Sequence, residues 1–64
     1  MTLIDLLKVT DLDSKVAVEL PEERFPYTGT ADEVIDDLPA DCLERVIVDV
    51  RLSTVYKAIY ITVE

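Results

Sequence analysis

Hydrophobic and polar positions alternate most regularly in the last third of the chain. Residues 46–52 and 55–63 carry apolar side chains at nearly every second position: Val46, Val48, Val50 and Leu52, then Val55, Ile59, Ile61 and Val63. A period of two is typical of a β-strand with one buried face. Ser53 and Thr54 separate the two segments, so the pattern predicts an antiparallel hairpin whose apolar row faces the core.

The first half of the chain predicts two further strands. In residues 15–20 the larger apolar side chains, Val16, Val18 and Leu20, stand at every second position until Pro21 ends the segment. Residues 24–30 form the predicted returning strand. Because Pro26 within this strand cannot donate a ladder hydrogen bond, we expect the strand at a sheet edge or with a bulge.

Two short helices are predicted, each beginning with a capping box. In a capping box, two residues three positions apart accept hydrogen bonds from each other's backbone N–H groups, which are otherwise free at a helix start. The two expected pairs are Thr2 with Asp5 and Thr30 with Glu33. The expected buried stripes are Leu3, Leu6 and Leu7 in the first helix, and Val34, Ile35 and Leu38 in the second.

Pro39 ends the second helix or restarts a further turn, in which Cys42 and Leu43 are expected to pack inward. The order of elements is then helix, strand, strand, helix, strand, strand. This order predicts a single α+β domain spanning residues 1–64, with a small antiparallel sheet of about four strands packed on two short helices.

A chain of 64 residues gains little stability from its core alone. A domain of this size buries only about 60% of the surface that its unfolded chain exposes. Cys42 is the only cysteine and there is no histidine, so neither an intrachain disulfide nor a zinc site can supply support. We therefore expect self-association, with a homodimer as its simplest form.

The charge of the chain is strongly acidic, with fourteen acidic and six basic residues and a formal net charge of −8. Such a surface disfavours direct binding to nucleic acids and to anionic membranes, which both attract basic residues. The apolar stretch at residues 3–9 is too short to span a bilayer. The single cysteine and the lack of a signal peptide predict a reducing, cytoplasmic location.

Composition also argues against catalysis. The chain contains no His, Asn, Gln or Trp. Without histidine there is no ordinary nucleophile–base pair and no side chain that titrates near neutrality. We expect a protein that is not an enzyme, that uses no cofactor and no metal, and that acts by binding.

One candidate binding surface is the acidic segment between residues 32 and 44. Its carboxylates could mimic nucleic-acid phosphates on a partner protein, or they could form a solvated helix face that keeps the domain soluble, which we favour. The candidate residues of this acidic face are Asp32, Asp36, Asp37, Asp41 and Glu44.

A second candidate surface is the face of the final hairpin opposite the predicted core. An antiparallel sheet with one covered face should be polar on the other. Tyrosines, an isoleucine and bordering arginines lie there instead, so we expect this face to be covered by a second copy, or by a separate ligand or protein. The candidate residues are Arg45, Ile47, Arg51, Tyr56 and Tyr60.

Four pieces of the chain form a recognisable layout: a helix of the form Met-Thr-x-x-Asp-Leu-Leu, a Tyr-x-Gly-x return, an Asp-Leu-Pro segment and a final alternating hairpin, here residues 1–7, 27–30, 37–39 and 46–63. This layout resembles that of short open reading frames in phages and integrated elements of Gram-positive bacteria. The resemblance implies a viral or mobile-element accessory protein that acts in the cytoplasm of a bacterial host cell. Small proteins of that origin are often inhibitors of host defence.

Three functions follow as hypotheses. The first is an inhibitor of a bacterial defence system that binds a host protein stoichiometrically. The second is a sponge for a nucleotide-derived immune signal, with Arg45, Arg51 and the tyrosines lining a pocket at a dimer interface. The third is a structural or assembly protein without a role in defence.

Overall fold

Helix α1 (Leu3–Lys8) begins at the predicted capping box in the computed structural model, which describes residues 1–64. The Thr2 hydroxyl accepts a hydrogen bond from the Asp5 N–H, and the Asp5 carboxylate accepts one from the Thr2 N–H at 3.0 Å. Thr30 and Glu33 make the same reciprocal pair at the start of α2 (Ala31–Asp37). Both helix starts are therefore fixed locally by the sequence.

The chain restarts a separate helical turn after Pro39, so there are three short helices rather than two. Helix α3 (Ala40–Leu43) is a single turn. Cys42 is buried and Leu43 packs partly against the core, as predicted. No helix of the structure has the length and apolar character needed to cross a membrane.

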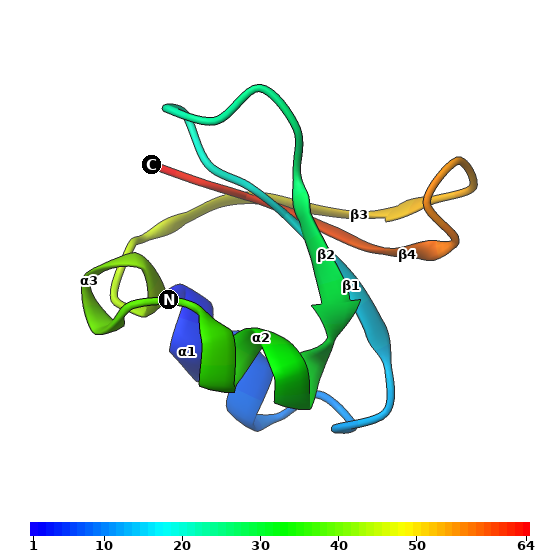
Figure 1. Ribbon diagram of the computed structural model, residues 1–64, viewed down its shortest axis with the longest axis horizontal. Coiled ribbons are helices and arrows are strands. Elements are labelled where there is room, and N and C mark those ends of the chain that lie inside the picture. The colour runs from blue at the N-terminus through cyan, green and yellow to red at the C-terminus, as the bar shows by residue number, and fades with distance from the viewer.

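Four strands form one sheet in the order β2-β1-β4-β3 (Figure 1). Their bounds are β1 Lys15–Glu19, β2 Tyr27–Thr30, β3 Ile47–Ser53 and β4 Ala58–Val63. The α+β class and the order of elements are confirmed. The β2 strand begins after Pro26 and lies at a sheet edge, as Pro26 predicts.

The sheet is mixed rather than wholly antiparallel. The β1–β2 and β3–β4 pairs are antiparallel, whereas the central β1–β4 pair is parallel. The reason is the connection through α2 and α3, which carries the chain from the β2 edge to the opposite edge, where β3 starts. The hairpin then returns β4 into the middle of the sheet, alongside β1.

The three helices lie on one side of the sheet, here called its inner face (Figure 1). The core between the two layers is apolar and contains no buried polar residue. Its members come from every element except β2 and β3: Leu3, Leu7, Val16, Val18, Leu20, Ala31, Val34, Leu38, Cys42, Ile61 and Val63. Ile61 and Val16 are among the largest fully buried side chains, so the parallel strand pair forms the floor of the core.

The prediction that the apolar row of β3 faces the core is wrong. Val46, Val48, Val50 and Leu52 are 46%, 61%, 45% and 83% exposed. A β-bulge between Ile47 and Asp49 breaks the alternation, so Ile47, and not Val46 or Val48, packs against the core. Val50 and Leu52 do lie on the inner face, opposite Ile61 and Ile59, but α2 packs on β2 and β1 and leaves this edge uncovered. Val55 was also expected in the core, yet it lies in the hairpin turn and is 83% exposed.

Candidate protein-binding face

The outer face of the sheet is the side away from the helices, and its centre is a row of four residues on adjacent strands. Thr28 on β2 lies opposite Ala17 on β1, Ala17 lies opposite Tyr60 on β4, and Tyr60 lies opposite Arg51 on β3. Each strand therefore contributes one side chain to this row. Because residues that lie directly opposite each other project from the same face of a sheet, the four side chains form one row on the outer face.

Tyr60 is the centre of the outer face and is only 8% exposed, although no helix covers it. The Arg51 guanidinium lies over its ring, 4.8 Å from the centroid, in cation–π geometry. The Tyr56 ring packs beside it with centroids 5.7 Å apart and a tilt of 40°. Side chains of the hairpin thus hold the Tyr60 ring in one position.

The Tyr60 hydroxyl is fixed as well. It donates a hydrogen bond to Oε1 of Glu19 at 2.6 Å. This bond, with partial burial and the nearby Glu19 charge, raises the pKa of Tyr60 above its usual value. On the other side Arg51 donates to Oδ2 of Asp49 at 3.0 Å. Tyr60 therefore lies between the Glu19 carboxylate on β1 and the Arg51–Asp49 ion pair on β3.

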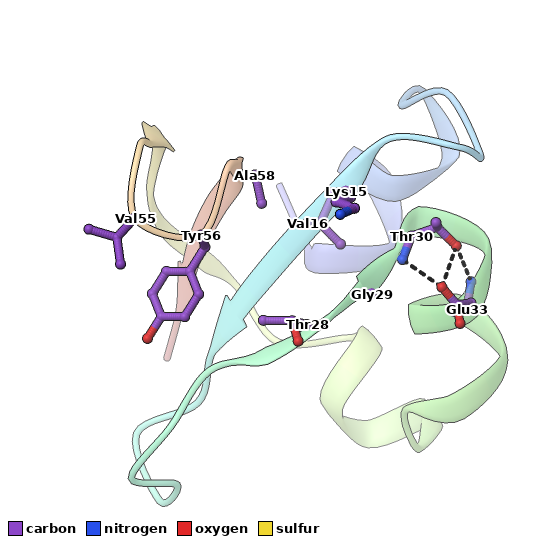
Figure 2. Close-up of a pocket in the computed structure, with 9 residues that line it drawn as sticks. All are labelled: Lys15, Val16, Thr28, Gly29, Thr30, Glu33, Val55, Tyr56 and Ala58. Carbon is purple, nitrogen blue, oxygen red and sulfur yellow. Dashed lines mark hydrogen bonds between the residues drawn. The ribbon is translucent and has the colours of Figure 1, made fainter.

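A groove of about 430 Å³ opens beside this cluster, between β2 and the hairpin turn. Figure 2 shows Val55 and Tyr56 at one side of the groove and Lys15, Thr30 and Glu33 at the other. Glu33 accepts hydrogen bonds from the N–H and hydroxyl of Thr30, each at 3.0 Å, so its carboxylate is engaged in the helix cap. These bonds lower the pKa of Glu33.

Three of the five candidate residues of this face, Arg51, Tyr56 and Tyr60, lie together in the structure, as the sequence predicts. The other two, Ile47 and Arg45, lie elsewhere. Ile47 belongs to the inner face, because the bulge shifts it there opposite Val63. Arg45 makes a bidentate ion pair with Glu22 and reaches the Glu64 carbonyl oxygen.

Arg45 therefore lies at the end of the sheet where β1 and β4 finish, and its guanidinium is occupied by Glu22. This hydrogen bond raises the pKa of Arg45 and lowers that of Glu22. Within one chain, Arg45 therefore lies apart from Arg51, which contacts Tyr60 and Asp49.

The acidic face forms a separate surface on the helix side. Its five candidate residues are all exposed and belong to α2, to α3 or to the residue that ends α3: Asp32, Asp36, Asp37, Asp41 and Glu44. Only Asp37 has a side-chain partner, the Tyr27 hydroxyl, which donates to it at 2.8 Å and whose pKa is raised by the bond. No group of three Cys, Asp or Glu side chains is close enough to hold a metal ion.

Sequence reasoning missed Glu19 and Ala17. The period of two along residues 15–20 does place both on the face opposite Val16 and Val18. Glu19 and Ala17 lie beside Tyr60 only because β1 and β4 pair in parallel. No local sequence pattern predicts that pairing. No family model, curated protein or solved structure matches the chain in comparisons with known proteins.

Proposed function

We propose that the protein is a non-enzymatic accessory protein of a phage or mobile element, which inhibits a bacterial defence system by stoichiometric binding to a host protein. The observation that supports this most is the Tyr60 cluster on the outer face. Tyrosine and arginine dominate the energetics of protein interfaces, because they combine apolar area with directional polar groups. Three such residues, Arg51, Tyr56 and Tyr60, meet there on an uncovered sheet.

The cluster is also preorganised for binding. Arg51, Tyr56 and Glu19 already restrict the Tyr60 ring and hydroxyl, so little side-chain entropy remains to be lost when a partner covers it. Tyr56 is 41% exposed and lies beside the groove, so it can enter a partner directly.

The acidic face has a different role in this proposal. It lies on the helix side, away from the Tyr60 cluster, so its charges act at a distance. A net charge of −8 steers the protein toward a basic partner and raises the association rate, an effect that salt screens over about 10 Å at moderate ionic strength. Neutralising Asp36, Asp37 and Asp41 together should therefore slow association more than it speeds dissociation.

The test is phage infection of a bacterial strain whose defence system restricts that phage. Expression of the protein should restore plaque formation, and one host protein should co-purify with it in a fixed stoichiometric ratio. Tyr56→Ala should abolish both effects. Phe25→Ala is the matched control, because it removes another exposed aromatic side chain, in the loop between β1 and β2. If Tyr56→Ala inhibits defence as well as the wild type, the outer face is not the binding site; if the wild type restores plaques in none of a panel of defence systems, the inhibitor proposal is wrong.

A nucleotide sponge is the second candidate, and the groove beside Tyr56 favours it. The groove offers Lys15 as a cation, an aromatic ring for stacking, and the Thr28 and Thr30 hydroxyls. Glu33 at the same groove opposes an anionic ligand. A cyclic dinucleotide should then raise the unfolding temperature by mass action, and Lys15→Ala should remove the shift. An unchanged unfolding temperature across a series of nucleotides would contradict this candidate.

A further inference from the structure

The free edge of β3 is the most apolar uncovered part of the sheet. β3 has seven residues and β4 is its only strand neighbour in the sheet. Met1 and Thr2 cover the start of its outer edge, where Thr2 forms a bridge with Val46 and the Ile47 N–H donates to the Met1 carbonyl oxygen at 2.9 Å. From residue 48 to residue 53 the row of backbone N–H and C=O groups on this edge has no strand partner. Three apolar side chains along this stretch are at least 45% exposed: Val48, Val50 and Leu52. The opposite edge differs, because β2 has four residues and follows Pro26. A long apolar edge strand is a template for pairing with another chain.

We propose that β3 pairs antiparallel with β3 of a second copy, about a two-fold axis through Val50. The pairing joins two four-stranded sheets into one continuous sheet. In this register Val50 lies opposite its own symmetry mate, Asp49 lies opposite Arg51 of the second copy, and Leu52 lies opposite Val48 of the second copy. The pairing is independent of the host partner proposed above, because it uses the edge of the sheet and leaves the outer face open.

Charge complementarity selects this register. Asp49 and Arg51 both project from the outer face, opposite Thr62 and Tyr60. A two-fold axis through Val50 sets each carboxylate against a guanidinium of the other copy. An axis through Arg51 or Asp49 would instead set like charges directly opposite, which destabilises a strand pair. Axes between residues would join an inner face to an outer face, which the period of two forbids.

The charge distribution along the chain also permits the approach. Residues 45–63 contain three basic residues and one acid, whereas the chain as a whole has a net charge of −8. The acidic helix α2 packs over β2 and β1, away from the β3 edge. Two β3 edges can therefore meet without bringing the acidic faces together, and on the inner face Val50 and Leu52 gain apolar neighbours from the second copy.

Cysteine cross-linking tests the register. Residues opposite each other in an antiparallel pair have Cα atoms about 4.5–5.5 Å apart, within the range of a disulfide. Val50→Cys should therefore form a covalent dimer rapidly under mild oxidation. Leu52→Cys is the matched control, since residue 52 lies about 13 Å from its own symmetry mate in this register. Cys42 is buried, so the wild type should not cross-link. Equal cross-linking of both variants, or none in either, would overturn the proposal.

Charge reversal provides a second test that does not depend on oxidation. Asp49→Arg alone sets arginine against Arg51 of the second copy, and Arg51→Asp alone sets aspartate against Asp49. Each variant should dimerise about tenfold or more weakly than the wild type in sedimentation equilibrium. An equimolar mixture should recover dimers, because every opposing pair is then complementary. Each variant also loses the ion pair within its own chain, so recovery on mixing cannot come from that pair. A wild type that stays monomeric over about 5 to 500 μM, or a mixture that fails to recover, would refute the pairing.

Discussion

Tyr60 donates its hydroxyl hydrogen to Glu19 across 41 residues of sequence, at 2.6 Å. The bond crosses the parallel β1–β4 pair on the outer face, and it completes the arrangement in which Arg51 and Tyr56 cover the same ring. One side-chain contact thus links the two central strands and fixes the centre of the candidate binding face.

Removal of the Tyr60 hydroxyl should lower stability while leaving the ring in place. The Tyr60→Phe variant should unfold at a lower urea concentration with an unchanged slope, because the bond to Glu19 is lost without loss of buried apolar area. Two tyrosines of the wild type, Tyr27 and Tyr60, have a pKa raised above the usual 10.0. In the variant only Tyr27 should remain as a tyrosine with a raised pKa. Ultraviolet absorbance during alkaline titration measures this loss, and an unchanged titration curve would contradict the assignment.

Alkaline pH should destabilise the wild type for the same reason. The folded chain holds the Tyr60 and Tyr27 protons more tightly than the unfolded chain, since the pKa of each tyrosine is raised. Stability is therefore retained below pH 10.0 and falls as the pH rises through the raised pKa values.

Acid should destabilise the protein through its helix caps and its ion pair. Hydrogen bonds from Thr2, Thr30 and Arg45 hold the pKa values of Asp5, Glu33 and Glu22 below the usual 3.8, 4.5 and 4.5. The stability they contribute is fully present above those usual values and is lost as the pH falls below them.

The Glu33→Gln variant tests the contribution of one cap. Its amide oxygen can still accept the Thr30 N–H, but it does not titrate. Urea unfolding from pH 6 down to pH 3 should show a shallower loss of stability than in the wild type. Glu44→Gln, which removes a carboxylate without a hydrogen-bond partner, is the control and should follow the wild-type curve more closely.

A matched pair of valine substitutions should separate the core from the exposed apolar residues. Val18 is fully buried, whereas Val55 is 83% exposed. Val18→Ala should reduce the free energy of unfolding by about 2–3 kcal/mol, through lost burial and an incompletely closed cavity. Val55→Ala should change it by less than about 0.5 kcal/mol. If urea denaturation shows that the two substitutions lower the free energy of unfolding equally, the hairpin turn is covered in solution.

The only glycine should be replaceable. Gly29 does not have a positive φ, and a Cβ added to it would meet Glu33 and Val34 at ordinary distances of 3.5 Å or more. Gly29→Ala should therefore raise the free energy of unfolding by about 0.4–1 kcal/mol, because the unfolded chain loses freedom. Thermal unfolding measures the change, and a clear loss of stability would show that β2 cannot accept a side chain there.

Lys57 presents the opposite case. It has a φ of 52° in the hairpin turn, the left-handed region that favours glycine. Lys57→Gly should relieve strain and stabilise the protein by up to about 1 kcal/mol. Lys57→Ala is the control, since it removes the same charged side chain but keeps the Cβ, and it should give no such gain.

The sequence predicted most accurately what depends on neighbours along the chain. Two capping boxes located α1 and α2, and Pro26 placed β2 at an edge. The bulge in β3 was not predictable from alternation, because Val46, Val48, Val50 and Leu52 form an unbroken apolar row. That row predicted a buried strand, while the helices, being only six, seven and four residues long, leave β3 uncovered.

The candidate site was predicted in part for a similar reason. Tyr56, Tyr60 and Arg51 belong to one hairpin, so their proximity follows from local pairing. Glu19 joins them only through the parallel contact of β4 with β1. Arg45 precedes the bulge, and its position was decided by Glu22, a partner 23 residues away.

The central place of β4 has a consequence for how the fold is made. β4 is synthesised after every other element, yet it is the strand that joins β1 to β3. While the ribosome is still adding residues 58–63, β1 and β2 can form only an isolated hairpin with three short helices, which is marginal in water. The nascent chain should therefore remain open to chaperones and proteases until β4 inserts between β1 and β3. Contacts this distant in sequence should also make folding slow for a domain of this size.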